Sequence, residues 1–298
     1  MNRSSKVLCD KEDRIFACLA HPPNEDGSWD VVHKGFQAAG ERMFTSLGPR
    51  KDEKERRGEF ESITWGLSIG QGQKVCGHML DVSAYNQELL DTFLLDPNVR
   101  RVISTCNSMF RYYFPKLFGD YVDVLHYYHK LTGDPGDWVP PLYEGIWAAA
   151  SYNNPPNVMT FEHVDQANKA NGICPIFSFG DFNAKTGGHL VLRQLKLVIE
   201  FPPGCFIFIP SATLIHGNIR IGKNEERGSF TMFTAGGLFR WVAYGGQTEK
   251  EMKERDGKRW YKDEEPKRAQ AWVESMSQFS TVSSLHTDRV YCNGRKEY

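Results

Sequence analysis

The chain has 298 residues, of which 40% are hydrophobic and 13% aromatic, so it can bury a full core and is not expected to be disordered. Its net charge of -1 excludes the overall excess of lysine and arginine that marks many nucleic-acid binders, so any DNA contact must come from local patches. Seven scattered cysteines without a CxxC pair disfavour a disulfide framework and a structural zinc site. Because no apolar run reaches the roughly 20 residues that cross a bilayer, we expect a soluble, intracellular protein with no membrane partner.

The first zone, residues 1–59, is expected to be a flanking segment that packs on the core. It contains amphipathic stretches such as residues 31–44. The charged run at residues 50–57 mixes both signs, which favours a solvated linker or helix face over a segment that contacts phosphate.

The next zone opens with strand-like alternation at residues 63–69 and continues into the glycine-rich run at residues 70–73. That run lacks the GKS or GKT of a P-loop and the glycine spacing of a dinucleotide site, so a phosphate cradle is not favoured. Helices are predicted after it at residues 86–95 and 99–118, and both are interpreted as packing helices.

From residue 147 to residue 241 the pattern changes to short runs of β-branched and aromatic residues between Gly, Pro and Asn. Strands are predicted at residues 176–179, 189–192, 195–201, 205–210, 218–221 and 229–234. Their even spacing favours a closed or double-sheet β architecture. In the charged tail we expect a helix at residues 249–259 and poorly defined structure over the last twenty residues.

Two His-x-Asp motifs occur in the chain, His163-Val164-Asp165 and His286-Thr287-Asp288. Only the first is followed by another histidine and an arginine in a strand context, so the second is interpreted as a chance match. Non-haem iron(II) oxygenases hold their metal with two imidazoles and one carboxylate on one face of an octahedron. His163 and Asp165 can project to the same face of an extended segment, and His216 is the candidate third ligand, expected from a strand of the opposite sheet.

Arg227 follows His216 and is the candidate partner for the distal carboxylate of 2-oxoglutarate, because arginine grips carboxylates with two parallel hydrogen bonds. Two short strands joined by a turn at residues 222–224 would return it to the pocket, and Ser229 on the same strand face can add a hydroxyl donor. The alternative is a surface salt bridge between Arg227 and Glu225 or Glu226. Three other histidines are interpreted as structural: His126, His129 and His189.

These residues resemble the TET/JBP family of nucleobase dioxygenases, and specifically its fungal branch. The resemblance runs from about residue 57 to residue 241. Its motifs are Gly66-Leu67-Ser68-Ile69-Gly70-Gln71-Gly72-Gln73, His163-x-Asp165-x-x-Asn168, Gly180-Asp181-Phe182, Gly187-Gly188-His189-Leu190, Phe201-Pro202-Pro203-Gly204 and Ser229-Phe230-Thr231-Met232-Phe233-Thr234-Ala235-Gly236-Gly237-Leu238-Phe239-Arg240-Trp241.

The resemblance implies an α+β fold with a double-stranded β-helix core, of the jelly-roll or cupin type, and flanking helices. A dioxygenase domain would span residues 60–246, with its β core mainly at 147–241, and residues 247–298 would be a polar C-terminal extension. The implied cofactors are Fe(II), 2-oxoglutarate as co-substrate and O2. The implied reaction is stepwise oxidation of a methyl group on a DNA base, most simply 5-methylcytosine to 5-hydroxymethylcytosine and further oxidised forms.

The same resemblance implies a role for each site residue. His163, Asp165 and His216 would be the catalytic metal ligands. Arg227 and Ser229 would bind 2-oxoglutarate. Asn168 would contact the flipped base. A flipped base also needs an aromatic shelf and amide donors near the metal, for which Phe233, Gln71 and Gln73 are the candidates.

Two departures from the animal members bear on the substrate. The chain has Phe233 and Ala235 where those members place Tyr and His to hold cytosine, so 5-methylcytosine, thymine and N6-methyladenine all stay open. The cysteine-rich zinc region of the animal members is also absent, so other elements would hold DNA. Because a base inside a duplex cannot reach such a pocket, the enzyme would flip it out. Phosphate contacts are expected from Arg56, Arg57, Lys74, Arg100, Arg101 and Arg111.

Three other functions are compatible with some of these residues. The same triad and arginine serve hydroxylases of proteins and small molecules, and a near-neutral charge favours that class. A non-catalytic binding module is disfavoured by the intact triad, and a cupin-like protein with another metal would leave Arg227 and Ser229 unused. A DNA substrate implies a nuclear location, although no basic targeting cluster stands out, and a monomer is expected, although the sequence does not determine the oligomeric state.

Overall fold

The computed structural model describes residues 4–48, 57–69, 73, 75–79, 82–133 and 141–294. Several residues named above lie outside the described residues: Gln71, Lys74, Gly70, Gly72, and the whole charged run before Arg57, which includes Arg56.

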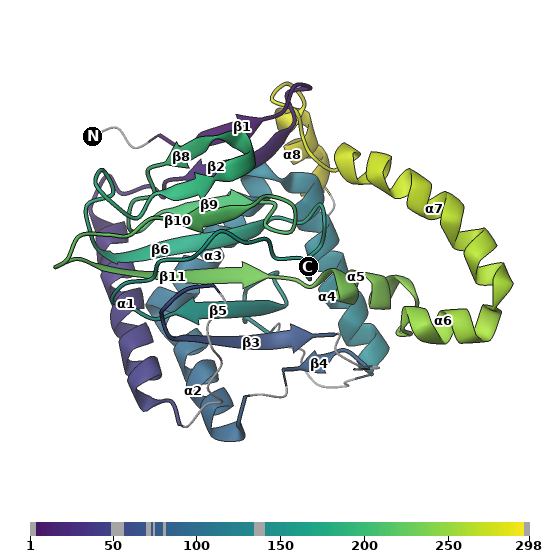
Figure 1. The fold of residues 1–298 in the computed structure, drawn as a ribbon, viewed down its shortest axis with the longest axis horizontal. Helices are drawn as coiled ribbons and strands as arrows, with labels where there is room; N and C mark the ends of the chain where they lie inside the picture. Colours follow the sequence, from purple (N-terminus) through teal and green to yellow (C-terminus); the bar gives the residue numbers. More distant parts are fainter. Residues whose placement is uncertain are drawn as a thin grey trace.

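A large antiparallel sheet of eight strands forms the centre of the molecule (Figure 1). Its strands, in spatial order, are β1 (Lys6–Cys9), β2 (Ile15–Ala20), β9 (Phe206–Ile209), β6 (Cys174–Asp181), β11 (Glu226–Phe233), β5 (Ala149–Asn153), β3 (Ser62–Ser68) and β4 (Gly77–His78). Strands from the first twenty residues and from residues 62–233 therefore meet in one sheet.

A smaller sheet faces it and contains β8 (Leu197–Ile199), β7 (Leu190–Leu192) and β10 (His216–Asn218). The segment that carries His163 pairs with β10 from the other side, because His163 and His216 exchange both backbone hydrogen bonds at 3.0 Å. From β5 onward the chain passes back and forth between the two sheets, except that β7 and β8 follow one another in the small sheet. This alternation is the winding of a double-stranded β-helix, so the predicted fold class is confirmed.

Four helices cover the outer face of the large sheet, behind it in Figure 1: α1 (Ser28–Ser46), α2 (Ala84–Leu95), α3 (Pro97–Tyr113) and α4 (Pro115–Thr132). Phe36 of α1 sits at the centre of this layer. Its ring centroid lies 5.1 Å from that of Phe177, 5.2 Å from that of Phe179 and 5.5 Å from that of Phe230. These edge-on and tilted contacts make an aromatic core that fixes the strands that carry the site.

The C-terminal helices begin directly after β11. They are α5 (Gly236–Ala243), α6 (Glu249–Asp256), α7 (Lys258–Ser277) and α8 (Leu285–Gly294). α6 and α7 project from the body as an arch, and α8 returns to the helical layer (Figure 1). There, Asp288 lies 3.2 Å from the ammonium of Lys116, and Arg289 donates to the carbonyl of Tyr112. None of the helices in the described ranges is long and apolar enough to cross a membrane.

Three predictions about helices and strands differ from the structure. The expected helix at residues 99–118 is two helices, because Pro115 lacks the backbone N–H that would continue α3 but suits the first turn of α4. The strand expected at residues 218–221 lies at 216–218 in the small sheet and forms no hairpin with β11. The prediction of a poorly defined C-terminus is wrong for α8, which includes Asp288 of the second His-x-Asp motif.

Candidate metal and carboxylate site

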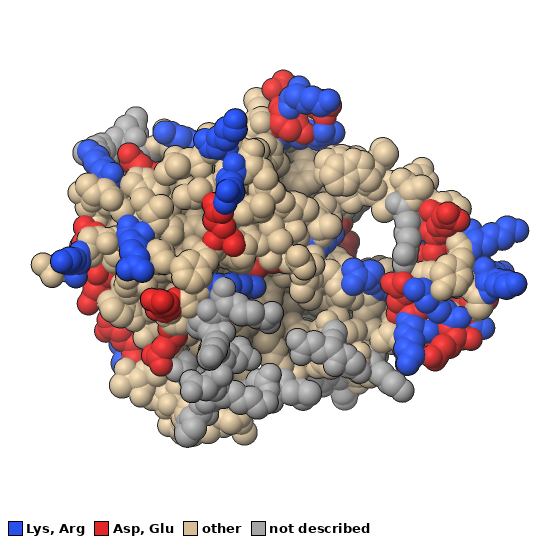
Figure 2. All heavy atoms as spheres, in the orientation of Figure 1, with Lys and Arg blue, Asp and Glu red and all other residues tan. Residues whose placement is uncertain are grey.

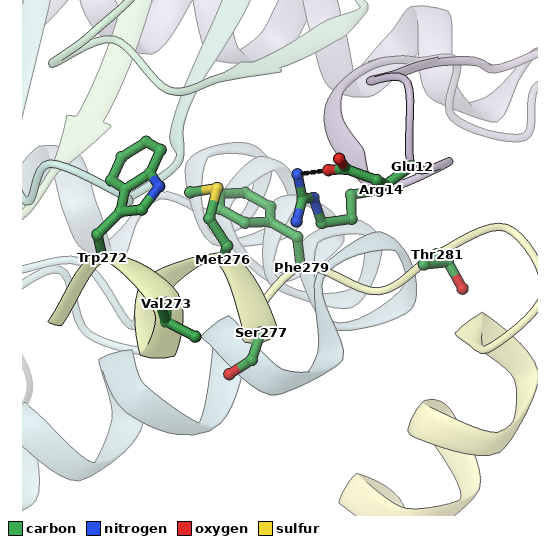
Figure 3. Close-up of a pocket in the computed structure, with 8 residues that line it drawn as sticks. All are labelled: Glu12, Arg14, Trp272, Val273, Met276, Ser277, Phe279 and Thr281. Atoms are coloured by element: carbon green, nitrogen blue, oxygen red, sulfur yellow. Dashed lines mark hydrogen bonds and ion pairs between the residues drawn. The ribbon is translucent and has the colours of Figure 1, made fainter. Parts of the chain in front are cut away.

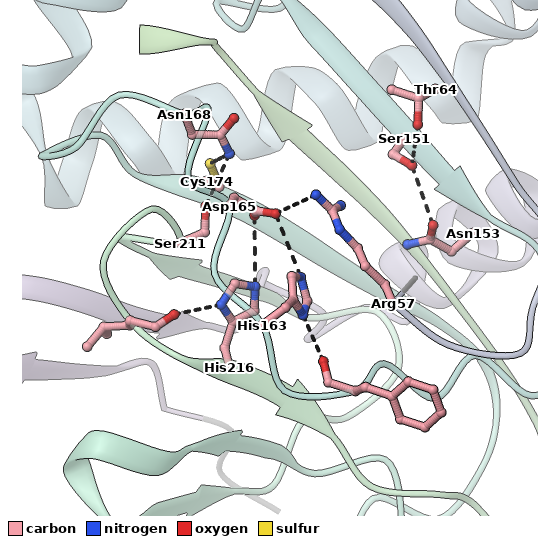
Figure 4. Close-up of polar contacts among 12 residues, drawn as sticks. Arg57, Thr64, Ser151, Asn153, His163, Asp165, Asn168, Cys174, Ser211 and His216 are labelled. Atoms are coloured by element: carbon pink, nitrogen blue, oxygen red, sulfur yellow. Dashed lines mark hydrogen bonds and ion pairs between the residues drawn. The ribbon is translucent and has the colours of Figure 1, made fainter. Parts of the chain in front are cut away.

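The structure brings His163, Asp165 and His216 together (Figure 4). Their candidate ligand atoms all lie within 4.8 Å of one another. Nε2 of His163 is 3.7 Å from Oδ1 of Asp165, and Nε2 of His216 is 3.9 Å from Oδ2 of the same carboxylate. Two imidazoles and one carboxylate that converge in this way are the donor set of a site for a divalent transition metal such as iron(II).

Backbone carbonyls fix the orientation of both imidazoles. Nδ1 of His163 lies 2.8 Å from the carbonyl oxygen of Phe161, and Nδ1 of His216 lies 2.8 Å from that of Leu214. Each Nδ1 therefore donates its hydrogen to a carbonyl and leaves the lone pair of Nε2 for a metal. Burial, together with the neighbouring His163, lowers the pKa of His216, which keeps this imidazole in the neutral form that binds metals.

The two histidines come from neighbouring segments of the small sheet. The expectation that His216 would lie on the opposite sheet is therefore wrong, although the residue itself is at the site. Gly217 makes the close pairing possible, because a Cβ there would lie 2.8 Å from the carbonyl oxygen of Thr160. Asp165 is placed by its backbone N–H, which donates to the carbonyl of Ser211.

Arg57 is a site residue that the sequence analysis assigned to DNA phosphate instead. Its Nη2 lies 2.7 Å from Oδ1 of Asp165, and its side chain is 53% exposed (Figure 4). The Arg57 carbonyl also accepts a hydrogen bond from the N–H of Phe161, which anchors this segment beside the metal ligands. No spacing rule connects Arg57 with a motif that follows so much later in the chain.

Arg227 lies on the inner face of β11, with its side chain almost fully buried at 2% exposure. Nη1 donates to the carbonyl of Val158 at 2.9 Å, whereas the buried Nε has no hydrogen-bond partner. The guanidinium lies about 6 Å from the ring centroids of Phe182 and Phe201, and burial lowers its pKa to about 10.

No carboxylate in the part of the chain that the structure describes forms an ion pair with Arg227. The salt-bridge alternative is wrong, because Glu225 accepts hydrogen bonds from the backbone N–H groups of Gly222 and Asn183, and Glu226 accepts one from Gln37. A buried guanidinium without an acidic partner is costly unless an anionic ligand completes the site. The site thus fits the predicted cofactors, Fe(II) at the triad and a dicarboxylate such as 2-oxoglutarate at Arg227, with coordination positions left open for O2.

Ser229 and Phe233 share the inner face of β11 with Arg227, because alternate residues of a strand point to the same side. Ser229 is 4% exposed, and its hydroxyl oxygen accepts a hydrogen bond from the amide of Asn153 at 2.8 Å. Phe233 is half-buried.

The other expected base contacts have partners within the protein or lie outside the described residues. The amide nitrogen of Asn168 lies 3.3 Å from the hydroxyl of Ser211 and 3.3 Å from the thiol of Cys174 (Figure 4). Gln73 accepts a hydrogen bond from Ser68 at 3.4 Å. Contact between any of these side chains and a base stays a prediction.

Several residues named in the sequence analysis lie away from the metal ligands. His126 and His129 belong to α4, and His189 is not part of the only metal-ligand group found in the described ranges. Three arginines expected to contact phosphate belong to α3, on the opposite side of the large sheet from the small sheet: Arg100, Arg101 and Arg111. Arg100 pairs there with Glu144, and Arg111 lies over the ring of Phe118.

The surface charges and the pocket in Figure 3 are features apart from the metal-ligand triad. The face drawn in Figure 2 carries interspersed positive and negative side chains, and both signs crowd together on the C-terminal arch. The pocket in Figure 3 lies between α7 and the turn that joins β1 to β2, where Arg14 pairs with Glu12. It contains none of the residues discussed above as metal or carboxylate ligands.

Comparisons with known proteins find solved structures that resemble this one, but no significant sequence match. No protein-family model matches the chain, and no curated protein sequence matches it significantly. NgTET1 in complex with 5mC DNA is 15% identical, with a TM-score of 0.49 over 85% of this chain and 84% of that one. OsALKBH1 is 13% identical, with a TM-score of 0.36 over 78% and 99%. A Pseudomonas putida prolyl-4-hydroxylase is 14% identical, with a TM-score of 0.31 over 69% and 86%.

Proposed function

We propose that the protein is an Fe(II)- and 2-oxoglutarate-dependent oxygenase. The observation that carries this proposal is the pairing of a two-histidine, one-carboxylate triad with a buried arginine that has no acidic partner among the described residues. The triad alone suits several metals and reactions. Arg227, which has no acidic partner among the described residues, favours an enzyme with an anionic co-substrate, because its buried charge is best stabilised by an anionic ligand between the two sheets.

Each residue then has a physical task. The bound metal and co-substrate supply the oxidising chemistry for hydroxylation of a C–H bond. His163, Asp165 and His216 hold the metal, and the two carbonyl-bound Nδ1 atoms keep the imidazoles aligned. Arg227 and Ser229 orient the co-substrate by its distal carboxylate. The apolar neighbours of Arg227, Phe182 and Phe201, exclude water and so strengthen that contact.

For the substrate we propose a methyl group on a DNA base, with 5-methylcytosine first and thymine and N6-methyladenine as members of the same class. The motif string from Ser229 to Trp241 supports this choice, and the half-buried ring of Phe233 offers an aromatic surface on which a flipped base can stack. Such a substrate would give the protein a nuclear location.

The direct test is mass spectrometry of nucleosides after incubation with Fe(II), 2-oxoglutarate, ascorbate and three duplexes. The duplexes carry 5-methylcytosine, N6-methyladenine or only unmodified bases including thymine. Oxidised product from one duplex, lost with Asp165→Ala, is the expected result and identifies the base. Intact bases in all three duplexes would contradict the DNA substrate, while succinate formation in the same reactions would still support the oxygenase.

A hydroxylase of proteins or small molecules is the second candidate. The arginines of α3 lie on the far side of the large sheet from the small sheet, and the face in Figure 2 shows charges of both signs. Succinate production stimulated by a peptide or metabolite, and not by DNA, would favour this candidate.

A further inference from the structure

A row of polar side chains crosses the inner face of the large sheet and ends at Ser229. It begins at Thr64 on β3, continues through Ser151 and Asn153 on β5, and reaches Ser229 on β11. Strand register aligns these residues, because Thr64 lies opposite Ser151 and Asn153 lies opposite Ser229. Figure 4 shows the first three members of this row.

The hydrogen bonds in the row all run in one direction. Thr64 donates to the hydroxyl oxygen of Ser151 at 3.0 Å, and Ser151 donates to Oδ1 of Asn153 at 3.4 Å. An amide oxygen can only accept and an amide nitrogen can only donate. The contact at 2.8 Å therefore makes Ser229 an acceptor from Nδ2 of Asn153.

Ser229 is left with one hydroxyl hydrogen and no described acceptor for it. Because its oxygen accepts from Asn153, the hydroxyl hydrogen points away from that amide and is available to donate to a ligand. Arg227, on the same strand face, is likewise a donor that lacks an acidic partner among the described residues. Both groups therefore select a ligand that accepts hydrogen bonds, and a carboxylate does so best.

We propose that Asn153 is a positioning residue that sets Ser229 as a hydrogen-bond donor to the distal carboxylate of 2-oxoglutarate. Thr64 and Ser151 in turn hold the amide of Asn153 in this orientation. The inference rests on the proposed function, because it assumes that 2-oxoglutarate occupies the space beside Arg227.

The test measures binding and not turnover. 2-Oxoglutarate is titrated by calorimetry into protein loaded with Mn²⁺, which replaces Fe(II) so that no reaction consumes the ligand. Asn153→Asp keeps the size of the side chain but replaces the amide that donates to Ser229 with an acceptor and adds a negative charge near the ligand. Its affinity for 2-oxoglutarate should fall by about tenfold or more. Affinity for Mn²⁺ alone should stay within about twofold, since the triad is unchanged.

A double-mutant cycle separates positioning from general support of the fold. Asn153→Ala and Ser229→Ala should each weaken binding, and the double variant should bind within about twofold of Ser229→Ala, because Asn153 acts only through Ser229. Asn86→Ala removes a buried asparagine on α2 as a matched control and should leave the affinity unchanged. Additive losses in the cycle, or wild-type affinity in Asn153→Asp, would overturn the inference. Failure of the wild-type protein to bind 2-oxoglutarate would overturn the proposed function itself.

Discussion

The two faces of the large sheet differ sharply although they share the same strands. On the outer face, Phe177 and Phe230 are fully buried against the helices. Their chain neighbours Ser178 and Ser229 point to the inner face. Arg227, two residues before Ser229 on β11, points to the same inner face. The comparison teaches that stability and chemistry are assigned to alternate residues of one strand, so changes at neighbouring positions should separate folding from ligand binding.

The largest effect should come from the candidate metal ligands, which lie on the inner side of the large sheet's partner, the small sheet. Asp165→Ala removes the only carboxylate of the triad, so metal affinity and turnover should fall by about a hundredfold or more. Metal titration and succinate formation measure the loss, and thermal unfolding of the metal-free protein checks that the fold survives. A variant that still binds Fe(II) like the wild type would show that the three residues are not a metal site.

A change on the outer face should lower stability and leave ligand binding intact. Phe230→Ala opens a cavity among aromatic rings and should lower the free energy of unfolding by about 3–5 kcal/mol. Denaturant unfolding measures this loss. At a temperature where the variant stays folded, its affinity for 2-oxoglutarate should match that of the wild type. A large loss of affinity in the folded variant would break the division between the two faces.

Arg227→Met should weaken the binding of 2-oxoglutarate without lowering the stability of the ligand-free protein. Affinity for 2-oxoglutarate should fall by about tenfold to a hundredfold, because charged hydrogen bonds to the carboxylate are lost. The free energy of unfolding of the ligand-free protein should stay the same or rise, because the variant no longer buries a charged guanidinium. The same burial lowers the pKa of Arg227 to about 10. Calorimetric titration and chemical unfolding give the two values. Marked destabilisation without ligand would mean that Arg227 serves the fold.

Arg57→Ala should have the smallest effect. Its side chain is half exposed, so its ion pair with Asp165 contributes at most about 1 kcal/mol to the metal-free protein. Metal affinity should rise by no more than about fivefold, because one competitor for the carboxylate is removed. Titration of Mn²⁺ into wild-type and variant protein shows whether metal affinity rises or falls. Arg100→Ala on α3 is the control and should leave metal affinity unchanged.

Much of the site follows from local sequence pattern. Runs of β-branched and aromatic residues predicted strands over half of β6, all of β9 and most of β11. The spacing of His163, Asp165 and His216 identified the triad that the structure brings together. These features were accessible because side-chain alternation and motif spacing are set by residues that are near one another in the chain.

Other parts of the site depend on residues that meet only through folding. The sequence by itself determined which side chains of β11 share a face and which donors suit a metal. Only the tertiary structure decided that Arg57 reaches Asp165, that His216 pairs with the segment of His163, and that Asn153 reaches Ser229. The physical reason is strand register: hydrogen bonds between segments far apart in the chain fix which side chains meet, and no local pattern encodes that choice.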